Sequence, residues 1–149
     1  MKYEGLFTRI ETAIERDPAR ALDEAVRLLA AEMPNYTWVG IYVVEGDELV
    51  LGPFIGKPSP HMRIPLGQGI CGAAATAKAT IVVDDVNADA RYLACSIETK
   101  SEIVVPIMRG DAVLGEIDID SDQAAAFGPA DRALLEPVAA MLAERLEEE

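Results

Sequence analysis

Tyr92 to Asp120, YLACSIETKSEIVVPIMRGDAVLGEIDID, is the stretch that decides the fold. Two segments with alternating side chains, 101–108 and 112–120, flank a short Arg-Gly-Asp turn, which predicts a pair of antiparallel strands. Because side chains alternate along a strand, one face of this pair is apolar and the other carries carboxyl groups. The apolar face takes Ile103, Val105, Ile107, Ile117 and Ile119, and the opposite face takes Glu102, Glu116, Asp118 and Asp120.

The rest of the chain predicts helices and strands around this hairpin. Apolar residues at helical spacing predict helices at 3–15 and from Asp17-Pro18 to about Met33, and β-branched and aromatic runs predict strands at 36–44 and 49–54. Gly56 to Gly69 holds three prolines and three glycines, so we expect a packed loop over a pocket. The remaining expectations are a helix at 69–79, a strand at 80–83, an irregular connection at 84–100 and a last helix from Gly128-Pro129. This order predicts one α+β domain, residues 1–149, with a mainly antiparallel sheet.

The acidic composition narrows the classes of partner. Asp and Glu number 26 against 13 Lys and Arg, and the formal net charge of -13 would repel phosphate backbones and anionic lipids. We therefore expect neither nucleic acid nor a membrane as a partner. The N-terminus lacks the apolar core of a signal peptide, and no stretch is apolar enough to span a bilayer, so a cytoplasmic location is expected.

The two cysteines, Cys71 and Cys95, are candidates for thiol chemistry. In a reducing compartment such residues are buried packing groups, a metal pair or redox thiols, and composition alone leaves these options open. Cys71 lies near the start of the predicted helix 69–79, where the helix dipole favours a thiolate. Cys95 lies in a loop with polar neighbours. The single histidine, His61, sits in the Pro-rich loop, so a hydrolase lacks a positioned base and zinc is weakly supported.

The acidic strand face admits three interpretations: a solvated surface, a metal site made of carboxylates, or a site for the ammonium group of a small molecule. Asp is depleted in strands, so the Asp-Ile-Asp-Ser-Asp run at 118–122 argues against a solvated surface. Its spacing also differs from a calcium-binding loop. On the strand 36–44, Trp38 and Tyr42 share a face with Gly40, and they either pack the sheet or line a small-molecule pocket.

Five motifs in order resemble those of the GAF-domain free methionine-(R)-sulfoxide reductases: LVLGPFIGKPS, ICG, LAC, SEIVVPI and GEIDIDS. The resemblance covers about 36–135. It implies a GAF-like fold, with helices packed on one face of a central antiparallel sheet and a loop-enclosed pocket on the other, and a homodimer. By position, Cys95 matches the family's catalytic cysteine and Cys71 a second thiol near it. The residues matching the substrate site are Glu102, Asp118 and Asp120 around the amino group, and Trp38 and Tyr42 along the side.

The resemblance also implies a reaction. Cys95 would reduce free L-methionine-(R)-sulfoxide and become a sulfenic acid, Cys71 would close a disulfide with it, and an external thioredoxin-like dithiol would restore both thiols, with no bound cofactor or metal. Many family members carry a further cysteine where this chain has Pro-Ser-Pro-His at 58–61, which leaves Cys71 as the other internal thiol. The alternative is a GAF module that binds a small amino compound, or senses redox state, without turnover.

Overall fold

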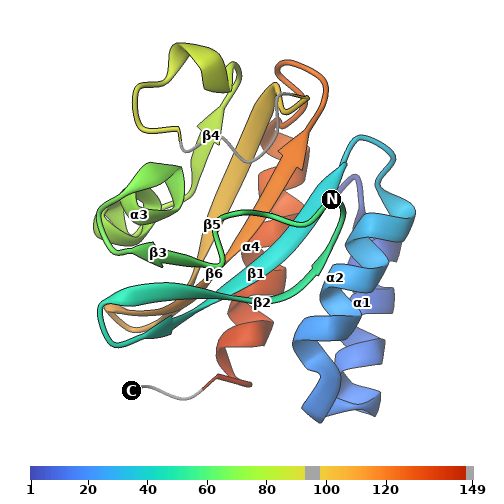
Figure 1. Cartoon of the computed structure of the whole chain (residues 1–149). Helices are drawn as coiled ribbons and strands as arrows, with labels where there is room; N and C mark the ends of the chain where they lie inside the picture. The colour runs from blue at the N-terminus through green and yellow to red at the C-terminus, as the bar shows by residue number, and fades with distance from the viewer. Residues whose placement is uncertain (93–97, 147–149) are drawn as a thin grey trace.

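The computed structural model describes residues 1–92 and 98–146, which form a six-stranded sheet covered by helices (Figure 1). The strand order is β3-β2-β1-β6-β5-β4, and neighbouring strands pair antiparallel throughout the described chain. The strands are β1 (Trp38–Glu45), β2 (Glu48–Ile55), β3 (Arg63–Pro65), β4 (Ile81–Val83), β5 (Ser101–Arg109) and β6 (Ala112–Ser121). The predicted α+β architecture and both predicted hairpins are confirmed.

Three helices, α1 (Glu4–Arg16), α2 (Ala21–Glu32) and α4 (Pro129–Ala143), cover one face of the sheet, with α4 behind β5 and β6 in Figure 1. They pack on the predicted apolar face, where the five isoleucine and valine side chains of β5 and β6 are almost completely buried. Burial of aliphatic side chains of this size is worth about 1.5–3 kcal/mol each. The first and last helices therefore share one sheet face.

The remaining α-helix, α3 (Gly69–Ala77), packs on the opposite face, where it contacts β3, β5 and β6 (Figure 1). A smaller core forms between α3 and the sheet, and it includes Trp38, Tyr42, Ile70 and Cys71. The two cores separate the roles of the two faces. One face anchors the fold, and the other carries the acidic residues.

The loop prediction for 56–69 is wrong at three residues, because Arg63–Pro65 forms β3 against β2. Ile64 pairs with Leu49 and is buried, which explains why this short segment docks on the sheet. β3 is an edge strand, where a proline is tolerated since its missing N–H faces no partner strand. The connection 84–100 contains a single 3-10 turn, Val86–Ala88, within its described part.

Within residues 1–92 and 98–146, the longest apolar helical segments fall short of what a bilayer crossing requires.

Candidate active site

Strand register gathers the acidic residues into adjacent rows. Trp38 of β1 lies beside Asp120 of β6, which lies beside Glu102 of β5. The next row on the same face contains Gly40, Asp118 and Val104, and the third contains Tyr42, Glu116 and Pro106. Alternation along the strands thus places four carboxyl groups in the middle of the sheet, next to the two aromatic residues.

These carboxyl groups are buried. Glu102 is 5% exposed, Glu116 0%, and Asp118 and Asp120 3% each. The interpretation as a solvated strand face is therefore wrong, because α3 packs over β5 and β6 and shields this face from water. A cluster of carboxyl groups in such surroundings is costly unless its members hold protons, share hydrogen bonds or meet a cation.

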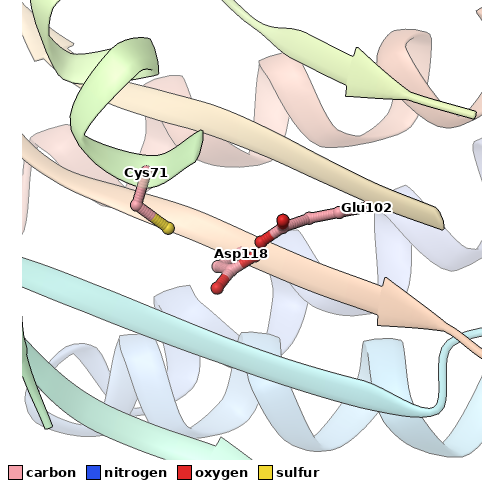
Figure 2. A group of neighbouring side chains, drawn as sticks. All are labelled: Cys71, Glu102 and Asp118. Carbon is pink, nitrogen blue, oxygen red and sulfur yellow. The ribbon is translucent and has the colours of Figure 1, made fainter. Parts of the chain in front are cut away.

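Cys71, in the first turn of α3, points its thiol at Asp118 (Figure 2). The thiol hydrogen-bonds to Asp118, and Glu102 hydrogen-bonds to both Asp118 and Asp120. The sulfur and one carboxyl oxygen each from Glu102 and Asp118 lie within 4.8 Å of one another. Gly72 lets the backbone of the preceding loop pack closely against α3, since a Cβ there would lie 2.8 Å from the Gly67 backbone.

A hydrogen bond between two carboxyl groups requires a proton on one of them, because ionised carboxylates have no hydrogen to share. Burial raises the pKa of Asp118, and burial together with the charge of Asp118 raises the pKa of Asp120 and of Glu116. The cluster therefore stays partly protonated at a pH at which exposed carboxyl groups are ionised. It is a potential proton donor in a closed site.

Burial also raises the pKa of the Cys71 thiol, and the charges of Asp118, Glu102 and Glu116 raise it further. The predicted position at a helix start is confirmed, but it does not make Cys71 a thiolate, since desolvation and like charge outweigh it. Cys71 is a free thiol in this structure. Cys95 lies outside the described residues.

Trp38 and Tyr42 share a face, as predicted, and each is both packed and turned toward a hollow. The Trp38 ring stacks on Phe54 with centroids 5.7 Å apart, and its Nε1 donates to the Lys57 carbonyl at 2.9 Å. The ring lies across Gly40, where an added Cβ would come within 2.3 Å of it. The Tyr42 hydroxyl donates to the His61 carbonyl at 2.8 Å.

Two hollows border this cluster. The outer cavity has a volume of about 260 Å³ and is lined by Thr37, Trp38, Lys57, Pro58, Ser59, Glu98, Thr99, Asp120 and Asp122. The inner hollow, of about 20 Å³, is lined by Tyr42, His61, Ile64, Gly69, Ile70, Cys71, Glu102 and Asp118. Because Glu102 hydrogen-bonds to Asp120, one network of hydrogen bonds reaches both hollows.

Lys57 is a site residue that sequence reasoning missed. Its Nζ forms an ion pair with Glu98 at 2.6 Å across the outer cavity, which joins the loop after β2 to the segment before β5. The expectation that the Pro-rich loop lies over a pocket is confirmed, since Pro58 and Ser59 line this cavity. The sequence signal that could have identified Lys57 is a lysine within the loop that is expected to cover a pocket.

Substitution of Glu116 tests how much free energy of folding the buried acidic face costs. Neither of its carboxyl oxygens has a hydrogen-bond partner in the described chain. Its raised pKa means that the folded protein binds this proton more tightly than the unfolded chain, so wild-type stability falls as pH rises above the ordinary glutamate range. We expect Glu116→Leu to raise the free energy of unfolding by about 1–4 kcal/mol near neutral pH, and by less at pH 5.

Urea unfolding at pH 5 and pH 8 measures this prediction, with Glu116→Gln as the matched variant. The amide also lacks the ionisable proton, so it should share the altered pH dependence but keep a buried polar group. Identical pH dependence in wild type and both variants would contradict the prediction.

The fold and this site define a GAF domain whose pocket holds a thiol among buried carboxyl groups. The GAF domain family model matches residues 17–146. The free methionine-R-sulfoxide reductase of Saccharomyces cerevisiae is 46% identical over 148 residues, covering 95% of this chain and 80% of the yeast protein. The protein of the same name from Escherichia coli is 36% identical, covering 77% of this chain and 69% of its own length.

A solved structure supports the same family as these two sequence relatives. The free methionine-R-sulfoxide reductase of Neisseria meningitidis, in complex with its substrate, superposes with a TM-score of 0.90 at 36% identity, covering 96% of this chain and 87% of that one. The chain belongs to the GAF-domain free methionine-R-sulfoxide reductase family. It is an oxidoreductase of that family.

Proposed function

We propose that this protein reduces free L-methionine-(R)-sulfoxide to methionine, with Cys95 as the attacking thiol and Cys71 as the resolving thiol. The observation that carries the proposal is the buried, hydrogen-bonded cluster of Cys71, Glu102, Asp118 and Asp120 beside a cavity of small-molecule size. The names of the yeast, Escherichia coli and Neisseria relatives support the same reaction.

The amino group of the substrate is the cation that the acidic face accommodates. Asp118 Oδ1 and Asp120 Oδ1 are buried and have no hydrogen-bond partner in the described chain, and an ammonium group brings three donors. Asp120 faces the outer cavity beside Trp38, so the ammonium would lie there with the side chain along the indole. Lys57 is the basic residue of the cavity lining and would meet the substrate carboxylate.

The reducing step needs a nucleophile and a proton. Cys95 sulfur attacks the sulfoxide sulfur, a protonated carboxyl of the cluster donates to the sulfoxide oxygen, and that oxygen passes to Cys95 as a hydroxyl. Thiol and sulfoxide thus become sulfenic acid and methionine, and the carboxyl regains the proton that Cys95 gave up. Glu102 and Asp118 are the candidates for this donor, since each takes part in the hydrogen bonds between carboxyl groups and lines the inner hollow with Cys71.

The resolving step uses the unusual state of Cys71. Its raised pKa keeps it a thiol until a sulfenic acid is formed nearby. Asp118, which accepts the hydrogen bond from the thiol, is placed to take the proton as Cys71 sulfur attacks Cys95 sulfur. The hydroxyl leaves as water and a disulfide forms. An external dithiol of the thioredoxin type reduces this disulfide and completes the cycle, so the proposed reaction needs no bound metal or cofactor.

We also propose that the working protein is a homodimer in the cytoplasm and that residues 1–149 act as one GAF domain. Size-exclusion chromatography with light scattering checks the dimer directly.

The test of the function is an assay of the purified protein with racemic methionine sulfoxide and a thiol reductant. We expect free methionine to form and only one sulfoxide diastereomer to be consumed. Chromatography on a chiral phase measures the sulfoxide that remains. Peptide-bound methionine sulfoxide should react poorly, because it lacks the ammonium group. If the protein binds the sulfoxide saturably but forms no methionine, the reductase proposal is wrong and the alternative, a GAF module that binds without turnover, is favoured.

The resolving role of Cys71 makes a separate prediction. Cys71→Ser should form about one equivalent of methionine per chain and then stop when thioredoxin is the reductant, because no disulfide can form for it to reduce. Mass spectrometry should show Cys95 oxidised and unpaired. Continued turnover with thioredoxin at the wild-type rate would remove Cys71 from the mechanism.

A further inference from the structure

The cluster of Cys71, Glu102 and Asp118, which the proposed reductase chemistry uses, is also a potential set of metal ligands. One sulfur and two carboxyl oxygens, from α3, β5 and β6, lie within 4.8 Å of one another, and all three side chains are buried (Figure 2). A single cation could contact all three atoms. The sulfur distinguishes this set from an ordinary acidic cluster, since thiolate ligands select soft or borderline metal ions over magnesium and calcium.

Unsatisfied oxygens beside this set also point to a cation, and those of Glu116 have no role in the proposed reductase chemistry. Asp118 Oδ1 and both oxygens of Glu116 are buried and have no hydrogen-bond partner in the described chain. Glu116, Asp118 and Asp120 also form no ion pair within residues 1–92 and 98–146. The hydrogen bonds inside the cluster depend on retained protons, which a bound cation would displace.

We propose that the reduced protein binds one thiophilic divalent cation of the Zn²⁺ class through Cys71 Sγ and one oxygen each from Glu102 and Asp118. Zinc takes about 2.3 Å to sulfur and about 2.0–2.2 Å to carboxylate oxygen in a tetrahedral site, so its ligand atoms lie roughly 3.5 Å apart. The three atoms approach this spacing with side-chain adjustments of about an ångström. Water from the inner hollow supplies the fourth ligand.

Binding releases protons, because zinc takes cysteine as its thiolate and carboxyl groups in their ionised form. Cys71 gives up its thiol proton, and the carboxyl groups give up the proton that they share. The cation therefore binds more tightly as pH rises. Its two charges also lower the repulsion among Glu102, Glu116 and Asp118, which the unliganded site can lower only by staying protonated.

The site would make the reductase sensitive to free zinc, a consequence that rests on the proposed function. A cation on Cys71 withholds the resolving thiol, and a cation on Asp118 competes with the substrate ammonium. Oxidation to a Cys71–Cys95 disulfide removes the sulfur ligand, so the cation would bind the reduced protein only. Zinc is thus an inhibitor of this site and not its resident cofactor.

The direct experiment uses the Cys95→Ser protein, in which Cys71 is the sole thiol, titrated with Cd²⁺ as a spectroscopic substitute for Zn²⁺. We expect one Cd²⁺ per chain and an ultraviolet thiolate-to-cadmium charge-transfer band. Asp118→Asn on this background should weaken binding at least tenfold, and Cys71→Ser should abolish the band. Circular dichroism confirms that each variant is folded.

Zn²⁺ titration calorimetry in two buffers of different ionisation enthalpy measures the proton release. Free methionine should weaken the binding of Cd²⁺ if the ammonium and cation positions overlap. No charge-transfer band in the Cys95→Ser protein, or equal affinity in Asp118→Asn, would overturn the inference. These readouts need no turnover, so a site that binds cadmium in a protein without reductase activity would refute the proposed function and leave the cation site standing.

Discussion

Cys95→Ser is expected to form no methionine from methionine sulfoxide above the level of a control without enzyme, even in a single turnover. The reaction transfers oxygen from one sulfur to another, and a serine hydroxyl is neither ionised at neutral pH nor able to form a sulfenic acid. Cys71 cannot replace it, because burial and three neighbouring carboxyl groups hold its pKa well above the ordinary thiol range.

The measurement is methionine formed per chain in a stoichiometric mixture of reduced protein and sulfoxide. Cys71→Ser is the matched control, since it also leaves one thiol but should yield about one equivalent. Trp38, the only tryptophan, lines the outer cavity and reports substrate binding by its fluorescence, so a loss of binding in Cys95→Ser can be recognised. One equivalent of methionine from Cys95→Ser would exclude Cys95 as the attacking thiol.

The strand pattern predicted much of this site. Alternation in 101–108 and 112–120 assigned every isoleucine and carboxyl group to its face, because the register is continuous from Ser101↔Ser121 to Ile107↔Gly115 and shifts only beyond Ile107, near the turn. The same rule paired Trp38 with Tyr42 on β1. Alternation also places Glu116 on the acidic face, but the family resemblance assigns substrate binding only to its neighbours. The strand pattern does not predict that both carboxyl oxygens of Glu116 are buried without a hydrogen-bond partner in the described chain.

Burial itself could not be read from the strands. Whether the acidic face meets water depends on α3, which ends 24 residues before β5 begins and reaches the sheet through tertiary packing. The same packing reverses the expectation for Cys71, since the helix start favours a thiolate in isolation but here faces Asp118. Lys57 was missed for a related reason: its ion pair with Glu98 joins two loops 41 residues apart.

Asp118→Asn is expected to lower kcat/KM by about 10²- to 10⁴-fold, the range typical of a lost acid or base. Asp118 is the residue at which the network converges, because Cys71 and Glu102 both hydrogen-bond to it. Asparagine keeps the shape but can neither hold the shared proton nor offset the ammonium charge. Asp131→Asn is the matched control, since Asp131 is also a buried aspartate but lies away from the cluster. Asp131 accepts a hydrogen bond of 2.6 Å from the Tyr36 hydroxyl. Its substitution should leave kcat/KM near the wild-type value.

Two further measurements separate this chemical role from a structural one. The wild-type rate should fall as pH rises through the raised pKa of the cluster, because the proton donor ionises, and Asp118→Asn should change the position of that alkaline limb. Removal of the Asp118 charge should also lower the pKa of Cys71, so alkylation of Cys71 at fixed pH should become faster. A variant with an unchanged pH profile and unchanged Cys71 alkylation would show that Asp118 only supports the fold. The network would then need another residue to link the resolving thiol to the proton donor.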